Sequence, residues 1–65
     1  MSITLHEIED ETKELYGEIR QNKYETSFEV IICLYGHTIY NNFFSTMRNA
    51  KRALSRNYKS IERSL

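Results

Sequence analysis

Basic residues near the C-terminus are the groups in this chain whose type and spacing could do chemistry. Five of them recur every three or four residues, which places them on one face of a helix. They are Arg48, Arg52, Arg56, Lys59 and Arg63. Such a cationic ridge could bind phosphates or an acidic protein surface. The competing interpretation is a solvated helix face, or a complement to acidic residues elsewhere in the chain.

The charges of the chain are unevenly distributed, although the formal net charge is zero. Residues 1–25 contain seven acidic side chains: Glu7, Glu9, Asp10, Glu11, Glu14, Glu18 and Glu25. In residues 41–65 the basic side chains are opposed by Glu62 alone. A chain of this kind either pairs with itself or offers its basic end to an acidic partner. Because a nucleic-acid-binding domain ordinarily has a net positive charge, a protein partner is the first interpretation and nucleic acid the second.

Catalytic and metal-binding patterns are missing from the sequence. Cys33 is the only cysteine, and between Ile32 and Leu34 it reads as a small buried hydrophobic residue. His6 and His37 have no second His or Cys at metal-ligand spacing. The N-terminal acids lack the inward-facing Glu-x-x-His pattern of carboxylate metal sites. We therefore expect no enzyme activity, no cofactor, no metal and no small-molecule substrate, and no motif is specific enough to identify a family.

The apolar run at residues 28–35 is the segment around which the other elements are arranged. Read as a helix, it is apolar on every side apart from Glu29, so it must be covered all round. The preceding stretch at residues 26–29 fits a capping box, with Thr26 as the N-cap. A β-hairpin over residues 28–44 is the alternative, because Val, Ile, Tyr and Phe favour strands.

A first helix is predicted before this run. Thr4 and Glu7 fit a second capping box. The apolar positions that follow at helical spacing are Leu5, Ile8, Thr12, Leu15 and Ile19. The link at residues 22–25 is short, which makes the two helices antiparallel neighbours. The second helix has no proline to stop it before the C-terminus, and Gly36 and the pair at residues 41–42 are its weak points.

The predicted fold is all-α: one small domain, residues 1–65, forming a helical hairpin whose long second helix could kink, assembled as a homodimeric bundle. The first helix would be about 27 Å long and the second about 58 Å, so one chain cannot cover its own apolar surface. A second copy would cover it. The predicted dimer interface is Val30, Leu34, Phe43, Met47, Leu54, Tyr58 and Ile61. A three-helix monomer broken near Gly36 is the alternative.

The predicted function is that of a small non-enzymatic interaction protein. It would be a regulator, adaptor or inhibitor that binds another macromolecule through its helix surfaces. The alternative is a nucleic-acid-binding transcriptional regulator that uses the basic face of the C-terminal helix. A cytoplasmic location without a membrane partner is expected, because the longest apolar run is far shorter than the roughly 20 residues needed to span a bilayer. A lone cysteine also suits a reducing compartment.

Overall fold

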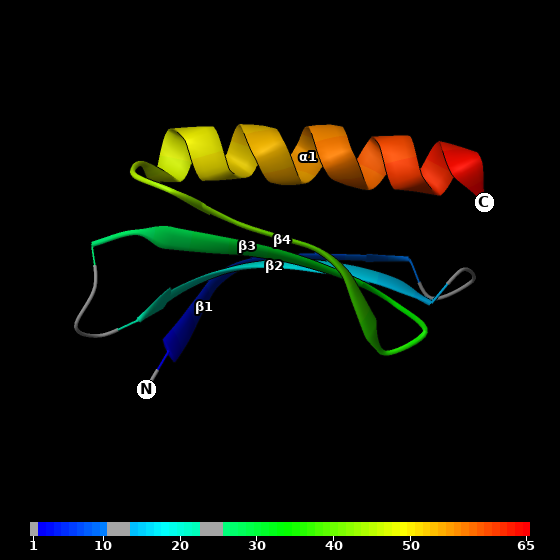
Figure 1. Ribbon diagram of the computed structural model, residues 1–65, viewed down its shortest axis with the longest axis horizontal. Helices are drawn as coiled ribbons and strands as arrows, with labels where there is room; N and C mark the ends of the chain where they lie inside the picture. Colours follow the sequence, from blue (N-terminus) through cyan, green and yellow to red (C-terminus); the bar gives the residue numbers. More distant parts are fainter. Residues whose placement is uncertain (1, 11–13, 23–25) are drawn as a thin grey trace.

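A four-stranded antiparallel β-sheet forms most of the protein, with one helix lying across one face (Figure 1). The computed structural model describes residues 2–10, 14–22 and 26–65. Neighbouring strands along the chain are also neighbours in the sheet, in the order β1-β2-β3-β4. The strands are β1 (Ser2–Asp10), β2 (Leu15–Asn22), β3 (Phe28–Leu34) and β4 (His37–Phe44).

The helix α1 (Met47–Ser64) follows β4 and runs along the sheet (Figure 1). It contacts β2, β3 and β4. No described element covers the opposite face, which is turned away from α1 and is the open face of the sheet. The molecule therefore has two layers, with its core between the helix and the sheet.

The predicted all-α helical hairpin is wrong. The residues of the predicted first helix form β1 and β2 instead. The residues of the predicted second helix form β3 and β4 as well as α1. Among the described residues, only those that follow Thr46 are helical. The error lies in the apolar run, because Val30, Ile31 and Ile32 are buried in a central strand. A short continuous apolar run fits a strand buried on both faces as well as a buried helix.

A two-residue turn at Tyr35 and Gly36 joins β3 to β4. Both residues have positive φ values, 51° and 80°, and Leu34 pairs with His37 beyond them. Positive φ at both positions is the type I′ conformation, whose twist matches that of the flanking strands. Gly36 is thus a hairpin residue, so the three-helix alternative is also wrong. The alternative hairpin over residues 28–44 is confirmed by β3 and β4.

The core forms where α1 crosses β2 and β3. The buried hydrophobic residues that make up this cluster are Leu15, Ile19, Val30, Ile32, Ala50, Leu54 and Tyr58. Gly17 in β2 lets the helix approach closely, since a Cβ added there would lie 2.7 Å from Cδ1 of Leu54. The Tyr58 hydroxyl donates a hydrogen bond of 3.1 Å to the Leu15 carbonyl. The helix is therefore fixed to the sheet by packing and by one buried polar contact.

The N-cap of the helix is Thr46, whose hydroxyl accepts a 3.2 Å hydrogen bond from the backbone N–H of Asn49. The caps predicted at Thr4 and Thr26 are wrong, because both predicted helices are strands. Thr4 lies in β1, where its hydroxyl donates to a carboxylate oxygen of Glu18 at 3.0 Å. Thr26 is exposed and precedes β3. Both helix starts were inferred from short patterns that also occur in strands.

Candidate functional site

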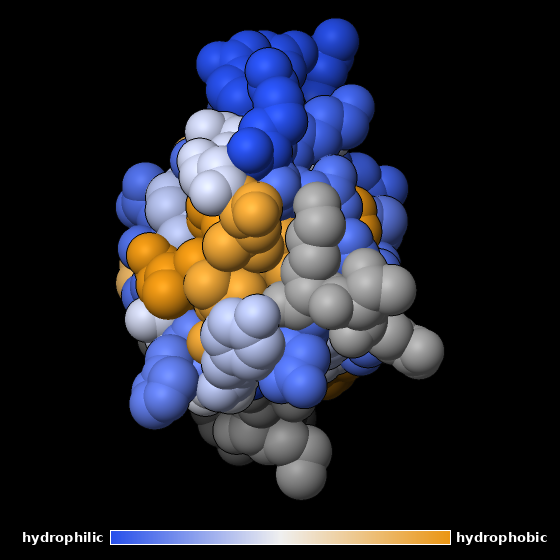
Figure 2. Space-filling model, turned by 90° about the vertical axis from the view of Figure 1, so that its right-hand side faces the viewer, coloured by the Kyte–Doolittle hydropathy of each residue, from blue (hydrophilic) through white to orange (hydrophobic). Residues whose placement is uncertain are grey.

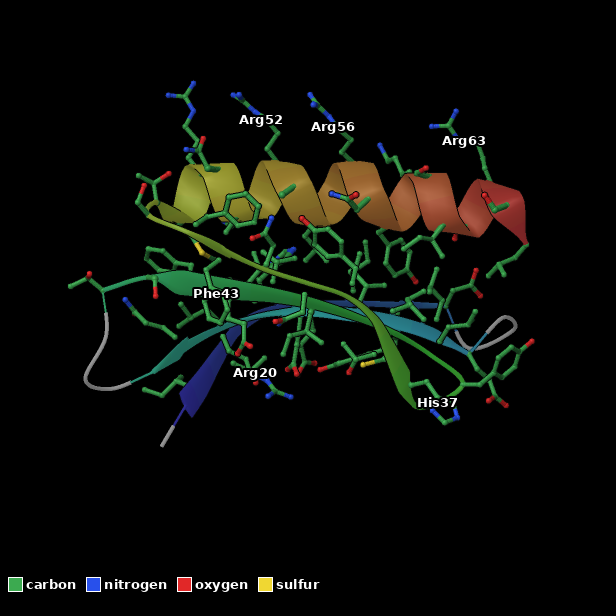
Figure 3. All side chains as sticks on the ribbon, in the orientation of Figure 1. Arg20, His37, Phe43, Arg52, Arg56 and Arg63 are labelled. Carbon is green, nitrogen blue, oxygen red and sulfur yellow. The ribbon has the colours of Figure 1, made fainter. Side chains whose placement is uncertain are left out.

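The five basic residues singled out in the sequence lie together on the outer face of α1. This basic ridge consists of Arg48, Arg52, Arg56, Lys59 and Arg63, all of them exposed. Packing sets its orientation, because Ala50, Leu54 and Tyr58 turn the opposite side of the helix into the core. Figure 3 shows Arg52, Arg56 and Arg63 pointing away from the sheet. The structure therefore brings the predicted ridge residues together on one surface.

The rest of the exposed surface of α1 is small and polar. Besides the ridge, the exposed residues of α1 are Asn49, Lys51, Ser55, Ser60 and Ser64. No acidic or large apolar side chain is exposed between Met47 and Ser64. Figure 2 shows the hydrophilic colour gathered at the top of the molecule, over the helix, with apolar surface below it. Lys51 adds a further positive charge that the ridge pattern did not include.

The ridge is a line of charges. From Arg48 to Arg63 it extends along about 22 Å of helix, with about one cation per turn. A linear polyanion such as a nucleic-acid strand, with a phosphate about every 3.4 Å along a duplex axis, matches a surface of this shape.

The open face carries acidic residues, and one of them is buried there. Glu18 is 5% exposed and forms an ion pair with Arg20. Its carboxylate accepts hydrogen bonds from Arg20 Nε at 2.6 Å, from Thr4 and from the hydroxyl of Tyr16 at 3.1 Å. Asn41 donates to Glu29 at 2.9 Å on the same face. These acidic groups lie on the opposite side of the sheet from the ridge, so they do not neutralise it locally.

Two pKa values on the open face reflect this network. Burial alone would raise the pKa of Glu18, but hydrogen bonds from Arg20, Thr4 and Tyr16 lower it by more, so the net direction is down. The pKa of Tyr16 is raised, first by burial and then by its hydrogen bond to Glu18. Glu18 is therefore a stable carboxylate already satisfied by its neighbours. These contacts tie β1 to β2 through the Glu18 carboxylate, which gives Glu18 a structural role.

A groove of about 380 Å³ runs beside the ridge, between α1 and the edge strand β4. Its lining residues are Tyr40, Asn42, Phe44, Asn49, Arg52, Ala53, Arg56 and Asn57. Arg52 and Arg56 belong to both the groove and the ridge. The strand side of the groove was not among the predicted site residues, although the alternate positions Tyr40, Asn42 and Phe44 would share one face of a strand.

The residues of the predicted dimer interface do not form one surface. Val30, Leu54 and Tyr58 are buried within their own chain. Leu34, Met47 and Ile61 are half-buried and pack against the same core. Phe43 differs from these residues, because it is 55% exposed and pairs with Glu29 across the open face. Apart from Phe43, the apolar residues that motivated a second copy of the chain thus pack against the sheet or the helix of the same chain.

The remaining reactive side chains are scattered. Cys33 is half-buried rather than buried, and its Sγ lies 3.6 Å from the hydroxyl of Thr38. His6 and His37 are exposed on β1 and β4. Among the described residues, no three His, Cys, Asp or Glu side chains are grouped as a metal site would require. The one helix of the described chain is too polar to cross a membrane.

Comparisons with known proteins give no relative: no family model, no curated protein and no solved structure matches this chain.

Proposed function

We propose that this chain is a non-enzymatic nucleic-acid-binding protein that contacts phosphates through the basic ridge of α1. The observation that supports the proposal is the composition of the exposed surface of the helix, which is limited to basic, Ser and Asn side chains. Arg and Lys, with Ser and Asn, are the residue types that contact phosphates in protein–DNA complexes. Arg side chains can also bind a phosphate through two parallel hydrogen bonds.

A protein partner, the first interpretation of the sequence, is less well supported at this surface. Protein interfaces have a hydrophobic centre, and a few aromatic or Arg anchors supply most of their binding energy. The exposed face of α1 contains Arg but has no aromatic or aliphatic side chain to form such a centre. A role as a transcriptional regulator, the alternative interpretation of the sequence, would follow from nucleic-acid binding rather than from a protein-binding helix.

The zero net charge of the chain does not oppose this proposal. The Glu18 and Glu29 carboxylates lie on the open face, across the sheet from the ridge. Interactions between exposed charges are largely screened beyond a Debye length, which is about 8 Å at physiological ionic strength. Glu62 lies in α1 itself, beside Lys59 and Arg63, and offsets part of the charge at that end of the ridge. At Arg48, Arg52 and Arg56 a phosphate would interact mainly with the helix cations next to it.

The test is the affinity of the protein for fluorescein-labelled DNA and RNA oligonucleotides, measured by fluorescence anisotropy at low salt. The ridge variant combines Arg52→Gln with Arg56→Gln and lowers the net charge by two. Its matched control combines His37→Glu with Thr38→Glu, which lowers the net charge equally at exposed positions of β4. Figure 3 shows His37 on the side of the molecule away from the ridge.

The ridge variant is expected to lose most of the binding, by about tenfold or more, while the control keeps it. Each lost contact to a charged group is worth about 1.5–3 kcal/mol in a favourable geometry. An equal loss of affinity in both variants would mean that net charge alone, and not the position of the ridge, determines binding. No binding of the unmodified protein to any oligonucleotide at low salt would contradict the proposal and return the protein-partner interpretation.

A further inference from the structure

We infer that the groove between α1 and β4 holds an unstacked base of a single-stranded nucleic acid while the ridge holds the adjoining phosphates. This inference rests on the proposed function and specifies its ligand. The groove, at about 380 Å³, is within the usual size range of small-ligand sites. Three features of its lining support this occupant: aromatic walls, unused amide groups and two arginines shared with the ridge.

The aromatic wall comes from β4. Tyr40 and Phe44 pair with Ile32 and Phe28 of β3, which places them on the face of the sheet that α1 covers. Both are only half-buried, because they lie at the edge of the helix–sheet interface and line the groove. Bases of single strands stack on aromatic side chains whatever their sequence, because every base has a π-face. The two rings therefore offer the groove a stacking surface.

The amide groups in the groove are partly unused. The Asn42 side-chain oxygen accepts a 2.9 Å hydrogen bond from the backbone N–H of Phe43, which leaves its NH₂ group as a donor. The Asn57 NH₂ group donates to the Ala53 carbonyl at 2.8 Å, which leaves its side-chain oxygen as an acceptor. A donor and an acceptor in one groove match the mixed pattern on the edge of a base. Asn49 adds a third amide to the lining.

The position of the arginines determines the form of nucleic acid. Arg52 and Arg56 line the groove and also belong to the ridge. A strand whose phosphates follow the ridge would therefore pass directly beside the groove. In a duplex the bases are stacked and paired, so none could enter without being flipped out. Single-stranded recognition, with splayed bases stacked on aromatic side chains, fits this geometry better.

The experiment compares three labelled ligands of one length: a single-stranded oligonucleotide, the same strand with abasic sugars, and a blunt duplex. It is run with DNA and, for the first and last ligands, with RNA. If binding depends on phosphate contacts alone, the abasic strand should bind as tightly as the base-bearing strand. The abasic strand therefore separates phosphate binding by the ridge from base binding by the groove. The base-bearing single strand is expected to bind roughly 5- to 150-fold more tightly than the abasic strand, the range expected for stacking of one base.

Variants locate the base-dependent binding. Ala53→Met fills the groove, and its control Ser60→Met adds the same side chain at an exposed position of α1 outside the groove. Asn42→Ala removes the donor at an exposed position, so it tests the groove even if Ala53→Met folds poorly. Both groove variants should lower the preference for the base-bearing strand at least threefold, and the Ser60 variant should keep it.

The outcomes distinguish this inference from the proposed function. Equal affinity for the base-bearing and abasic strands, or a preference for the duplex, would overturn the groove assignment and leave ridge binding intact. A base preference that Ala53→Met and Asn42→Ala both leave unchanged would overturn it as well. Absence of binding to all three ligands at low salt would overturn both proposals. A base preference in either DNA or RNA that the groove variants abolish would support the inference.

Discussion

Tyr58 of α1 and Leu15 of β2 are joined by a buried hydrogen bond of 3.1 Å, from the tyrosine hydroxyl to the leucine carbonyl. It connects the C-terminal helix to the start of the second strand, 43 residues earlier in the chain. Tyr58 is also part of the core, and the pKa of its hydroxyl is raised, mainly because it is buried. Together with the packing of Ala50 and Leu54, the contact holds α1 on the sheet with the basic ridge on its exposed side.

Replacing Tyr58 with Phe should lower the free energy of unfolding by about 1 kcal/mol, because the hydrogen bond is lost and the ring remains. Urea unfolding measured by circular dichroism checks this value. Tyr35→Phe is the matched control, since Tyr35 is 62% exposed and its loss of a hydroxyl should have almost no effect. Equal stability of both variants would show that the Tyr58–Leu15 contact contributes nothing.

The close approach at Gly17 gives a second prediction. Gly17→Ala places a Cβ against the buried Leu54 and should cost about 1–3 kcal/mol by overpacking. Leu54→Val shortens the facing side chain, so the double variant should lose less stability than the sum of the two single variants. The measurement is a double-mutant cycle in urea. Strict additivity would mean that α1 does not contact β2 at this point.

Acid should weaken the protein through Glu18. Its folded-state pKa lies below the usual 4.5, so the ionised group adds stability above that value, and this stability is lost as the pH falls through the folded pKa. Glu18→Gln should therefore be less stable at pH 7 and should lose less stability between pH 5 and pH 2. Thr4→Ala removes one donor to Glu18, so its loss of stability between pH 5 and pH 2 should lie between those of Glu18→Gln and the unmodified protein. Parallel stability curves for Glu18→Gln and the unmodified protein would refute the network.

The helical part of the structure could be predicted from sequence because its signals are local. Ala50, Leu54 and Tyr58 follow the helical period on one side, and the basic ridge follows it on the other. No competing pattern occurs after Thr46. The five ridge residues were therefore placed correctly on one exposed helix face, although the helix was assigned to the wrong fold, and their role as a binding site stays a prediction.

The sheet was missed because its strands imitate helices over short distances. Leu15 and Ile19 are four residues apart, which fits a helix, but Gly17 between them is buried on the same side and Glu18 on the other. That alternation is the strand signal. It was obscured because Glu18 is an acid whose burial becomes favourable only when Thr4, from the neighbouring strand, and Arg20 reach it. Thr4 is 14 residues from Glu18 along the chain, so this partner cannot be read from the local sequence.

The start of α1 gives a further prediction, which separates the observed N-cap at Thr46 from the N-cap predicted at Thr26. Thr46→Ala removes the observed N-cap and should lower the free energy of unfolding by about 1 kcal/mol. Thr26→Ala should be nearly neutral, because Thr26 is exposed and caps no helix in the structure. Denaturant unfolding of the two variants makes the comparison. A larger loss for Thr26→Ala would support a helix at residues 27–35 instead of β3.

The salt dependence of nucleic-acid binding tests the function of α1 most directly. Each phosphate contact to a single strand contributes about −0.7 to the slope of log Kobs against log salt, so five ridge contacts predict a slope of about −3.5. Arg52→Gln with Arg56→Gln should reduce it to about −2 by removing two contacts. Anisotropy titrations of the same single-stranded oligonucleotide at several salt concentrations give both slopes. A slope near zero, or one that the double variant leaves unchanged, would contradict phosphate binding by the ridge.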